Sequence, residues 1–328
     1  MKFGQEILPD LLEKFMSKVK FSALSITYNQ EKFVQAMIDS VINQSVLPFE
    51  FIISDDCSTD RTWEIIQANQ KKYPSIIKAF RHEKNIGLYK NLNFALSQVT
   101  GDVLCALGGD DFFADDLFFN LIKVIEKESI NVKNEAFIIV TNTAHYYPNG
   151  KITYWNNYRL RNRNIFKEQL RGGVSLRWIG YSTFLLPYMM APEDMGYGAD
   201  WYRNTLLYYH CPKYYFANFI STYYRVGVGV TSKLKLKDFA EQSYSAIPIF
   251  IEKHRDKLSL SDIRYLRYAQ SINQFYTSGK IVHYFIALFK LLLNINNLSP
   301  NNNFIKHLKV LLPFKNILYK IRKWLYGY

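Results

Sequence analysis

The stretch FSALSITYNQEKFVQAMIDSVINQ, residues 21–44, joins an apolar run to an amphipathic one. Its first seven residues, 21–27, are mostly small or apolar, which is typical of a strand buried in a sheet. Asn29 comes next, and asparagine is a preferred helix cap. From residue 33 onward apolar residues recur at helical spacing and predict one core-facing stripe, made of Phe33, Val34, Met37, Ile38, Val41 and Ile42. The stretch therefore predicts a strand, a short loop and a helix.

The same order of strand, loop and helix is repeated along the chain. Thr59 or Asp60 is expected to cap the second helix, and Gly101 ends the third. A fourth apolar run follows that glycine. The further strands are predicted at residues 49–54, 76–82 and 103–108. Strands that alternate with helices predict an α/β fold with a Rossmann-like, mostly parallel sheet and helices on both faces.

Polar residues follow three of these strands, as the pairs Tyr28-Asn29, Asp55-Asp56 and Asp110-Asp111. Ligands of such sheets bind beyond the carboxyl ends of the strands, so we expect the three pairs to converge on one edge. Adjacent carboxylates repel each other unless solvent, a cation or a basic partner offsets their charge. The simpler alternative for the acid pairs is a helix cap or a solvated turn. Asp115 and Asp116 are better placed to cap the helix after the fourth strand.

The pattern changes after residue 130. Residues 136–155 predict a β-hairpin that turns at Asn149-Gly150. A basic stretch with little periodicity follows, as expected of loops around a site. Its aromatic residues are most simply core, although four are candidates to stack on a sugar: Trp155, Tyr158, Trp178 and Tyr181. The predicted organisation is a helical extension (1–20), an α/β domain (21–232, in halves 21–130 and 131–232) and a basic helical region (233–328).

The net charge of +13 comes from two segments, residues 281–328 with +7 and residues 151–190 with +6. A nucleic-acid-binding protein needs a basic stripe across its recognition face, whereas this chain keeps acids at its strand ends, which disfavours that class. Three cysteines are too few for a disulfide framework and indicate a reducing compartment. The N-terminal residues lack the pattern of a signal peptide, and the longest apolar run is too short to span a bilayer. We therefore expect a cytoplasmic protein.

Five segments stand out in this order: LSITYNQEKFVQAMIDSVINQS, FEFIISDDCSTDRTWEII, NIGLYKNLNFALSQVTGDVLCALGGDD, GYGADWYRNTLL and YYRVGVGVTS. Together, over residues 21–232, they resemble the family-2 inverting glycosyltransferases of bacterial surface-polysaccharide type, which have the GT-A fold. The resemblance implies transfer of a sugar from a nucleotide-diphosphate sugar, a UDP-sugar being favoured, to a hydroxyl of a glycan or glycolipid acceptor. It also implies a role in the synthesis of capsule, O-antigen or a related polysaccharide.

By this resemblance, residues 21–130 would bind the nucleotide and residues 131–232 the acceptor. Either Asp55 or Asp56 would accept a hydrogen bond from the nucleobase imide. A helix N-terminus and a lysine beside the nucleotide suit a diphosphate. The base pocket would be lined by Thr27, Tyr28 and Asn29, and the loop and helix start beside the nucleotide would be formed by Asn85, Gly87, Lys90 and Asn91.

The pair at 110–111 resembles the family's metal motif of acid, small residue, acid, acid. Gly108 replaces the first acid, a departure that removes a carboxylate expected near the ribose or a metal-bound water. Gly109 takes the small position and would let the nucleotide approach the backbone closely. Asp110 and Asp111 would hold Mn²⁺ or Mg²⁺, with Asp110 also beside the nucleotide, because phosphates supply the remaining ligands of such an ion.

Asp200, in GYGADWYRNTLL, matches the acid of the family's second-half motif and would be the catalytic base. Inverting transfer needs one carboxylate to accept the proton of the attacking hydroxyl. Glu193 and Asp194 are the runner-up candidates, and the structural alternative for Asp200 is a helix N-cap.

The segment FKNILYKIRKWLY, residues 314–326, is amphipathic and basic. It predicts a helix on the anionic cytoplasmic face of a membrane, with docking on the protein's own core as the alternative. The rival enzyme class is a sugar nucleotidyltransferase. Such enzymes generally have a glycine-rich basic loop after the first strand, where this chain has TYNQEKF.

Overall fold

The computed structural model describes residues 19–170, 176–196, 198–229, 236–278 and 286. The chain divides into two compact units: the first unit contains residues 1–169, 173–194 and 202–234, and the second unit contains residues 170–172, 195–201 and 235–328. Most of the predicted N-terminal extension and the whole of the predicted membrane helix lie outside the described residues.

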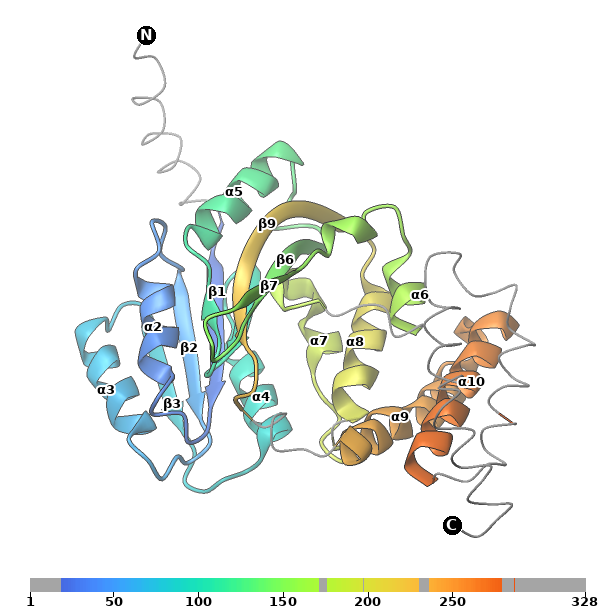
Figure 1. The fold of residues 1–328 in the computed structure, drawn as a ribbon. Helices are drawn as coiled ribbons and strands as arrows, with labels where there is room; N and C mark the ends of the chain where they lie inside the picture. The colour runs from blue at the N-terminus through green and yellow to red at the C-terminus, as the bar shows by residue number, and fades with distance from the viewer. Residues whose placement is uncertain (1–18, 171–175, 197, 230–235, 279–285, 287–328) are drawn as a thin grey trace. The chain divides into compact units, whose positions relative to one another are not determined.

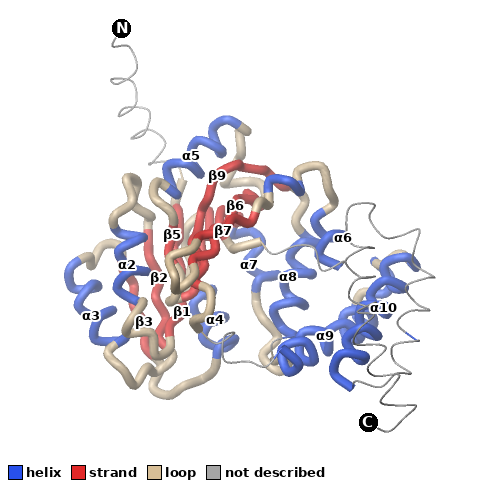
Figure 2. The backbone as a smooth tube through the Cα atoms, viewed as in Figure 1, coloured by secondary structure: helices blue, strands red, loops and turns tan. Residues whose placement is uncertain are grey.

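The first unit contains one nine-stranded sheet, drawn in red in Figure 2, in the order β3-β2-β1-β4-β8-β6-β9-β5, with β7 paired to β6. Strands β1 to β4 are parallel to one another, and β6 is parallel to β9. Strands β5, β7 and β8 are antiparallel to their neighbours, so the sheet is mixed. The strands are β1 (Phe21–Thr27), β2 (Glu50–Asp55), β3 (Ile77–Arg81), β4 (Val103–Gly108), β5 (Phe112–Phe113), β6 (Ile138–Tyr146), β7 (Ile152–Trp155), β8 (Ile179–Ser182) and β9 (Tyr214–Arg225).

The α-helices described are α2 (Val34–Ile42), α3 (Thr62–Lys72), α4 (Leu88–Ser97), α5 (Leu117–Lys127), α6 (Ile165–Leu170), α7 (Leu186–Met189), α8 (Gly198–His210), α9 (Leu236–Lys253) and α10 (Leu260–Ser278). Helices α9 and α10 belong to the second unit. Short 3₁₀ turns are present at Tyr158–Leu160, Thr183–Leu185 and Arg255–Lys257. Within the described ranges, no helix is both long and apolar enough to cross a membrane.

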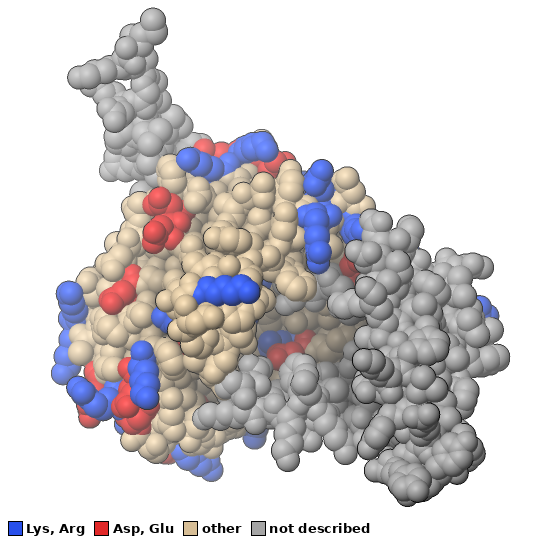
Figure 3. Space-filling model, viewed as in Figure 1, with Lys and Arg blue, Asp and Glu red and all other residues tan. Residues whose placement is uncertain are grey.

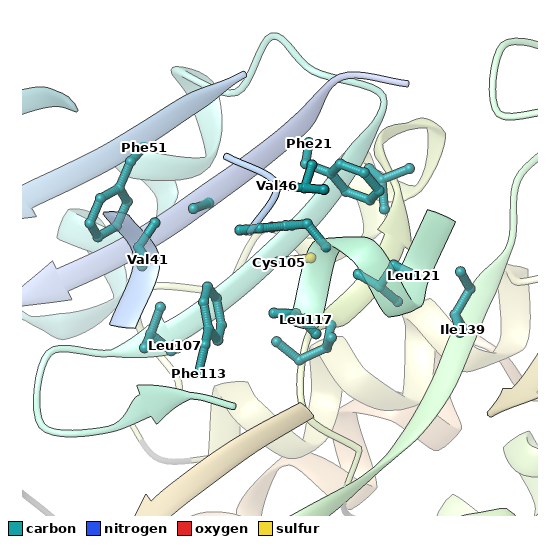
Figure 4. Packing of buried hydrophobic residues seen from close by; sticks show 14 of the residues in the cluster. Phe21, Val41, Val46, Phe51, Cys105, Leu107, Phe113, Leu117, Leu121 and Ile139 are labelled. Carbon is teal, nitrogen blue, oxygen red and sulfur yellow. The ribbon is translucent and has the colours of Figure 1, made fainter. Parts of the chain in front are cut away.

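Two apolar clusters fill the two faces of the sheet. Successive side chains of a strand point to opposite faces, so in β1 Phe21 and Ala23 join one cluster and Leu24 joins the other. The first cluster packs the sheet against α2, α3 and α5, and Figure 4 shows its side chains. The second packs it against α4 and the later part of α8. The α/β prediction is confirmed, with helices on both faces (Figure 1).

The predicted cap of α2 is wrong. The chain makes a turn first, in which the N–H groups of Phe33 and Val34 donate to the carbonyl of Gln30, and α2 begins at Val34. The side-chain oxygen of Asn29 instead accepts from the N–H of Thr59, 2.8 Å away. Asn29 therefore joins two loops rather than starting a helix.

Of the two candidates predicted to cap α3, Asp60 accepts a helix N–H, whereas the cap predicted for α5 is wrong. Asp60, not Thr59, receives an N–H at the start of α3, from Thr62 at 2.9 Å. Asp116 occupies the N-cap position of α5, but its side chain caps no helix N–H and accepts from the Ser45 hydroxyl. Asp115 is exposed. The hairpin prediction is confirmed, because β6 and β7 pair on either side of Gly150, whose φ is +79°.

Candidate active site

The carboxyl ends of β1, β2 and β4 meet at one edge of the sheet, as predicted. Thr27 pairs with Asp55, and Ile26 pairs with Gly108. The first residues after β2 and β4 are tied to β1: the N–H of Asp56 donates to the Thr27 carbonyl at 2.9 Å, and that of Gly109 to the Ile26 carbonyl at 3.2 Å. The three polar segments therefore start side by side.

Asp55 is fully buried and bound by neighbours on two loops. Its Oδ1 accepts from the hydroxyls of Thr27 (2.9 Å) and Ser58 (2.5 Å), and its Oδ2 accepts from the N–H of Ser58 (2.9 Å). The Nε of Arg81 lies 3.8 Å from Oδ2. Asp55 thus fixes the loops after β1 and β2 and does not cap α3, which excludes the simpler sequence alternative for this residue.

Asp56 holds the loop that precedes α4. Its two carboxylate oxygens accept from the N–H groups of Ile86 (2.7 Å) and Gly87 (3.0 Å). Gly87 has a φ of +91°, a conformation that favours glycine, and α4 begins at the next residue. The predicted loop and helix start are therefore in place, and neither of the two acids is a cap of α3.

The polar residues on the start of α4 differ in exposure. Asn91 is buried; it accepts from the Ser54 hydroxyl at 2.6 Å and donates to the Ser54 carbonyl at 3.1 Å, so it anchors α4 to β2. Asn85 and Lys90 are exposed. On the other side of the edge, the Tyr28 ring is 45% exposed and is available to a ligand.

The acid pair after β4 is held in a turn by β9. The N–H of Asp111 donates to the Gly108 carbonyl at 3.1 Å. Arg225, at the end of β9, donates from its guanidinium to the Asp110 carbonyl at 2.6 Å and from its backbone to Asp111 Oδ1 at 2.9 Å. A second arginine, Arg177, lies 3.9 Å from Asp111 Oδ2. Both arginines were missed by reasoning from the sequence, although Arg225 lies within the quoted segment YYRVGVGVTS.

Burial dominates the electrostatics of the pair. It raises the pKa of Asp111 to about 7 against the opposing charge of Arg177, and the neighbouring Asp110 raises it further. Burial also raises the pKa of Asp110. Burial lowers the pKa of Arg225, whose guanidinium lies 5.4 Å from the centroid of the Phe33 ring and 4.6 Å from that of the Phe112 ring. Burial therefore outweighs the effect of the two arginines on the pKa values of both carboxyl groups.

Glycine backbones surround the Asp110 carboxylate. A Cβ at Gly108 would lie 2.7 Å from Asp110 Oδ1, and a Cβ at Gly229 would overlap Oδ2. Gly109 has equally little room, because a Cβ there would overlap the side-chain oxygen of Gln30. The glycine that replaces the first acid of the motif therefore leaves space that the Asp110 carboxylate uses.

The acid pair fits a divalent cation. Among the described residues, no group of three or more His, Cys, Asp or Glu is arranged to hold a metal. Asp110 is the more accessible of the two, since Asp111 is buried against Arg225. One or two carboxylates suffice when substrate phosphates complete the coordination. A cation would also offset the cost of ionising two buried acids.

The base candidates lie after β8. Asp200 is in the first turn of α8 and in the second unit. Since α8 begins at Gly198, Asp200 lies inside the helix and not at its N-cap. Glu193, in the first unit, lies 4.0 Å from Lys90 and is half-exposed, and Asp194 is exposed.

The four aromatic candidates for sugar stacking divide into two groups. Tyr181 is fully buried and Trp178 is 9% exposed, and both belong to the apolar cluster that contains Leu24, so they are core residues. Trp155 is 38% exposed and Tyr158 is partly exposed. Only the last two keep a surface that a ligand can reach.

Comparison with known proteins agrees with this geometry. Residues 22–183 match the sequence pattern of glycosyl transferase family 2. The dTDP-rhamnosyl transferase RfbG of Shigella flexneri is 32% identical over 129 residues, which are 38% of this chain and 43% of RfbG. The poly(ribitol-phosphate) β-N-acetylglucosaminyltransferase TarS of Staphylococcus aureus is 30% identical over 117 residues, 35% of this chain and 20% of TarS. The chain thus spans less than half the length of these curated relatives.

Solved structures share the fold. Residues 1–349 of S. aureus TarS in complex with UDP-GlcNAc superpose with a TM-score of 0.56 at 18% identity, covering 81% of this chain and 89% of that one. The mannosyltransferase PcManGT of Pyrobaculum calidifontis, in complex with GDP-Man and Mn²⁺, gives 0.50 at 13% identity, covering 90% and 85%. The predicted GT-A fold is confirmed, and through residues 22–183 the chain belongs to glycosyl transferase family 2.

Proposed function

We propose that this chain transfers a sugar from a nucleotide-diphosphate sugar, a UDP-sugar being favoured, to a hydroxyl of a surface glycan or glycolipid, with inversion at the anomeric carbon. The observation that carries the proposal is the sheet edge where Tyr28, the α4 start and the acid pair meet. The complexes of TarS with UDP-GlcNAc and of PcManGT with GDP-Man support a nucleotide-sugar donor.

The residues at the edge have separable roles in the proposal. The exposed ring of Tyr28 packs on the base, while Asp55 and Asp56 keep the loops around it in place. The start of α4 and Lys90 attract the diphosphate. Asp110, with Asp111, would hold Mn²⁺ or Mg²⁺, and a bound dication supplies charge stabilisation to the departing nucleotide diphosphate. The Mn²⁺ complex of PcManGT supports that choice of ion.

Asp200 is the proposed base, and it would accept the proton of the attacking acceptor hydroxyl. Replacing Asp200 with Asn is expected to leave UDP binding intact and to lower transfer by about 10²- to 10⁴-fold, the usual worth of a general base. The matched variants are E193Q and D194N. If D200N transfers sugar at a near-normal rate while E193Q or D194N loses transfer, the role of base belongs to the residue whose replacement abolishes transfer.

The acid pair is tested by calorimetry of UDP with and without Mn²⁺. Mn²⁺ should raise the affinity of the unaltered chain for UDP, and D110N should lose that increase. The expected loss is at least about tenfold, since even outer partners of metal ligands are worth about 10- to 100-fold. D115N, an exposed acid five residues further on, is the control and should behave as the unaltered chain. An equal response in D110N and D115N would reject the metal assignment.

A further inference from the structure

A row of three aromatic rings with an arginine at each end leads from the acid pair to the β6–β7 hairpin. It begins at Arg177, which lies 3.9 Å from Asp111 and 4.3 Å from the centroid of the Tyr224 ring. Tyr224 meets His145 edge to face, with centroids 5.5 Å apart. The row, called here the Trp155 row, consists of Arg177, Tyr224, His145, Trp155 and Arg159.

The outer part of the row is a stack on the hairpin. His145 lies nearly parallel to Trp155, with 13° between the ring planes and 6.2 Å between the centroids. The guanidinium of Arg159 lies 5.4 Å from the centroid of the Trp155 ring. Trp155 is 38% exposed, so this end of the row is open to solvent.

Sheet register explains why these side chains share one face. His145 is paired with Tyr224 across β6 and β9, and Thr143 is paired with Trp155 across β6 and β7. Paired residues lie on the same face, as do residues two apart along a strand. Tyr154, next to Trp155 and 66% exposed, therefore lies on the opposite face of the same hairpin.

The surroundings of the row are basic. Residues 136–167 contain no acid and five bases, which are Lys151, Arg159, Arg161, Arg163 and Lys167. Of these, Lys151, Arg159, Arg161 and Lys167 are exposed. In Figure 3 the visible surface around the β6–β7 hairpin is mostly uncharged with basic side chains, and the acidic groups lie mainly elsewhere.

We propose that the Trp155 row binds the acceptor, and that this acceptor is a glycan chain carrying phosphate or carboxylate groups. This inference rests on the proposed function, because the row matters for transfer only if sugar is transferred beside the acid pair. The exposed part of the Trp155 ring packs against the apolar face of a sugar ring. Arg159 and Arg161 pair with the anionic groups, and guanidinium suits both phosphate and carboxylate. The row then leads the glycan toward Asp111.

A lipid surface fits this face less well than a glycan. Membrane insertion needs a continuous apolar face. The neighbours of Trp155 on its face are Thr143, Thr153 and His145, all of them polar. Polar groups around one exposed ring are what a sugar needs, since its hydroxyls remain hydrogen-bonded while its C–H face packs.

The test measures by calorimetry how three polymers bind to the full-length protein. They are poly(glycerol phosphate), polygalacturonate and neutral dextran. W155A should weaken binding of the preferred anionic chain by about tenfold, the size expected for loss of one well-packed aromatic contact. Y154A, the neighbour on the opposite face, should bind as the unaltered chain does. W155F should retain most of the affinity, which separates ring stacking from a folding defect.

Charge is tested by the double variant R159A/R161A. It should weaken binding of the anionic chains, leave any dextran binding unchanged and flatten the salt dependence, because exposed charge pairs are screened by salt. Comparing poly(glycerol phosphate) with polygalacturonate shows which anionic group the row prefers. If all three chains bind equally, or none binds, the inference is overturned.

Two further outcomes decide against the row as a glycan site. The first is that W155A and Y154A weaken glycan binding equally. The second is that W155A abolishes binding to vesicles of anionic phospholipid but leaves glycan binding unchanged. UDP binding with Mn²⁺ is measured on the same variants and should not change in W155A. Glycan binding without any UDP binding would contradict the proposed function and leave the glycan site standing, so the two failures are distinguishable.

Discussion

The pKa values of two buried acids in the first unit shift in opposite directions because the two acids have different hydrogen-bond donors. At Glu50 burial acts to raise the pKa, but bonds from Lys78, Ser22 and Thr100 outweigh it and lower the pKa below the ordinary 4.5. These donors are close: Lys78 Nζ and the Ser22 hydroxyl at 2.6 Å, and the Thr100 N–H at 2.7 Å. At Asp111 burial prevails and raises the pKa to about 7. The number of donors, not burial alone, decides the charge state.

Replacing Glu50 with Gln should lower the free energy of unfolding at pH 7 by about 2 kcal/mol, because bonds to a buried charged acceptor are lost. A group with a lowered pKa stabilises the fold above its unfolded pKa and loses that effect as the pH falls through the folded pKa. The difference in the free energy of unfolding between the unaltered chain and E50Q should therefore be largest at pH 7 and should shrink below about pH 4.5. Urea denaturation from pH 3 to pH 7 measures it, and a difference independent of pH would contradict this account.

Helix α5 is capped by a side chain from another element. The buried Gln44, just beyond the end of α2, accepts from the N–H of Leu117 at 2.7 Å and donates to the carbonyl of Ala114 at 2.9 Å. The N-cap residue Asp116 has a left-handed φ of +55°, and its carboxylate is bound to Ser45. Gln44 thus joins the end of α2 to the start of α5, the helix that follows the acid pair in the chain.

Replacing Gln44 with Ala should destabilise the chain by about 2 kcal/mol, because a buried N–H and a buried carbonyl lose their partner. Gln67→Ala, at an exposed position within α3, is the control and should stay within about 0.5 kcal/mol. Hydrogen exchange of the Leu117 amide provides a local readout and should speed up in Q44A. Unchanged exchange with unchanged stability would show that water replaces the glutamine without cost.

At the scale of the whole molecule, charge is the unevenly distributed property. The excess of +13 resides in residues 151–190 and 281–328, while the sheet edge carries acids. The first of these segments includes Arg159 of the Trp155 row. The second ends in residues 314–326, where Lys315, Arg322 and Lys323 alternate with apolar residues at helical spacing.

Deleting residues 304–328 should reduce flotation of the chain with liposomes that contain anionic lipid. Each basic residue near such a surface contributes on the order of 1 kcal/mol, so binding should also weaken with salt. The full-length variant K315E/R322E/K323E is the matched control, because it keeps the apolar face. Its flotation should fall as far as that of the deletion, and equal flotation of all three proteins would argue against a membrane role.

The sequence by itself determined the order of strands and helices in residues 21–130, because burial on two sheet faces leaves a periodic record along the chain. It also located the acids at the sheet edge, since parallel strands bring their carboxyl ends together. Only the tertiary structure decided which partners these acids meet. Arg225 lies 114 residues from Asp111, and Gln44 lies 73 residues from the helix that it caps. Such contacts depend on strand register and on how loops pack, and neither leaves a periodic signal in the residues that take part.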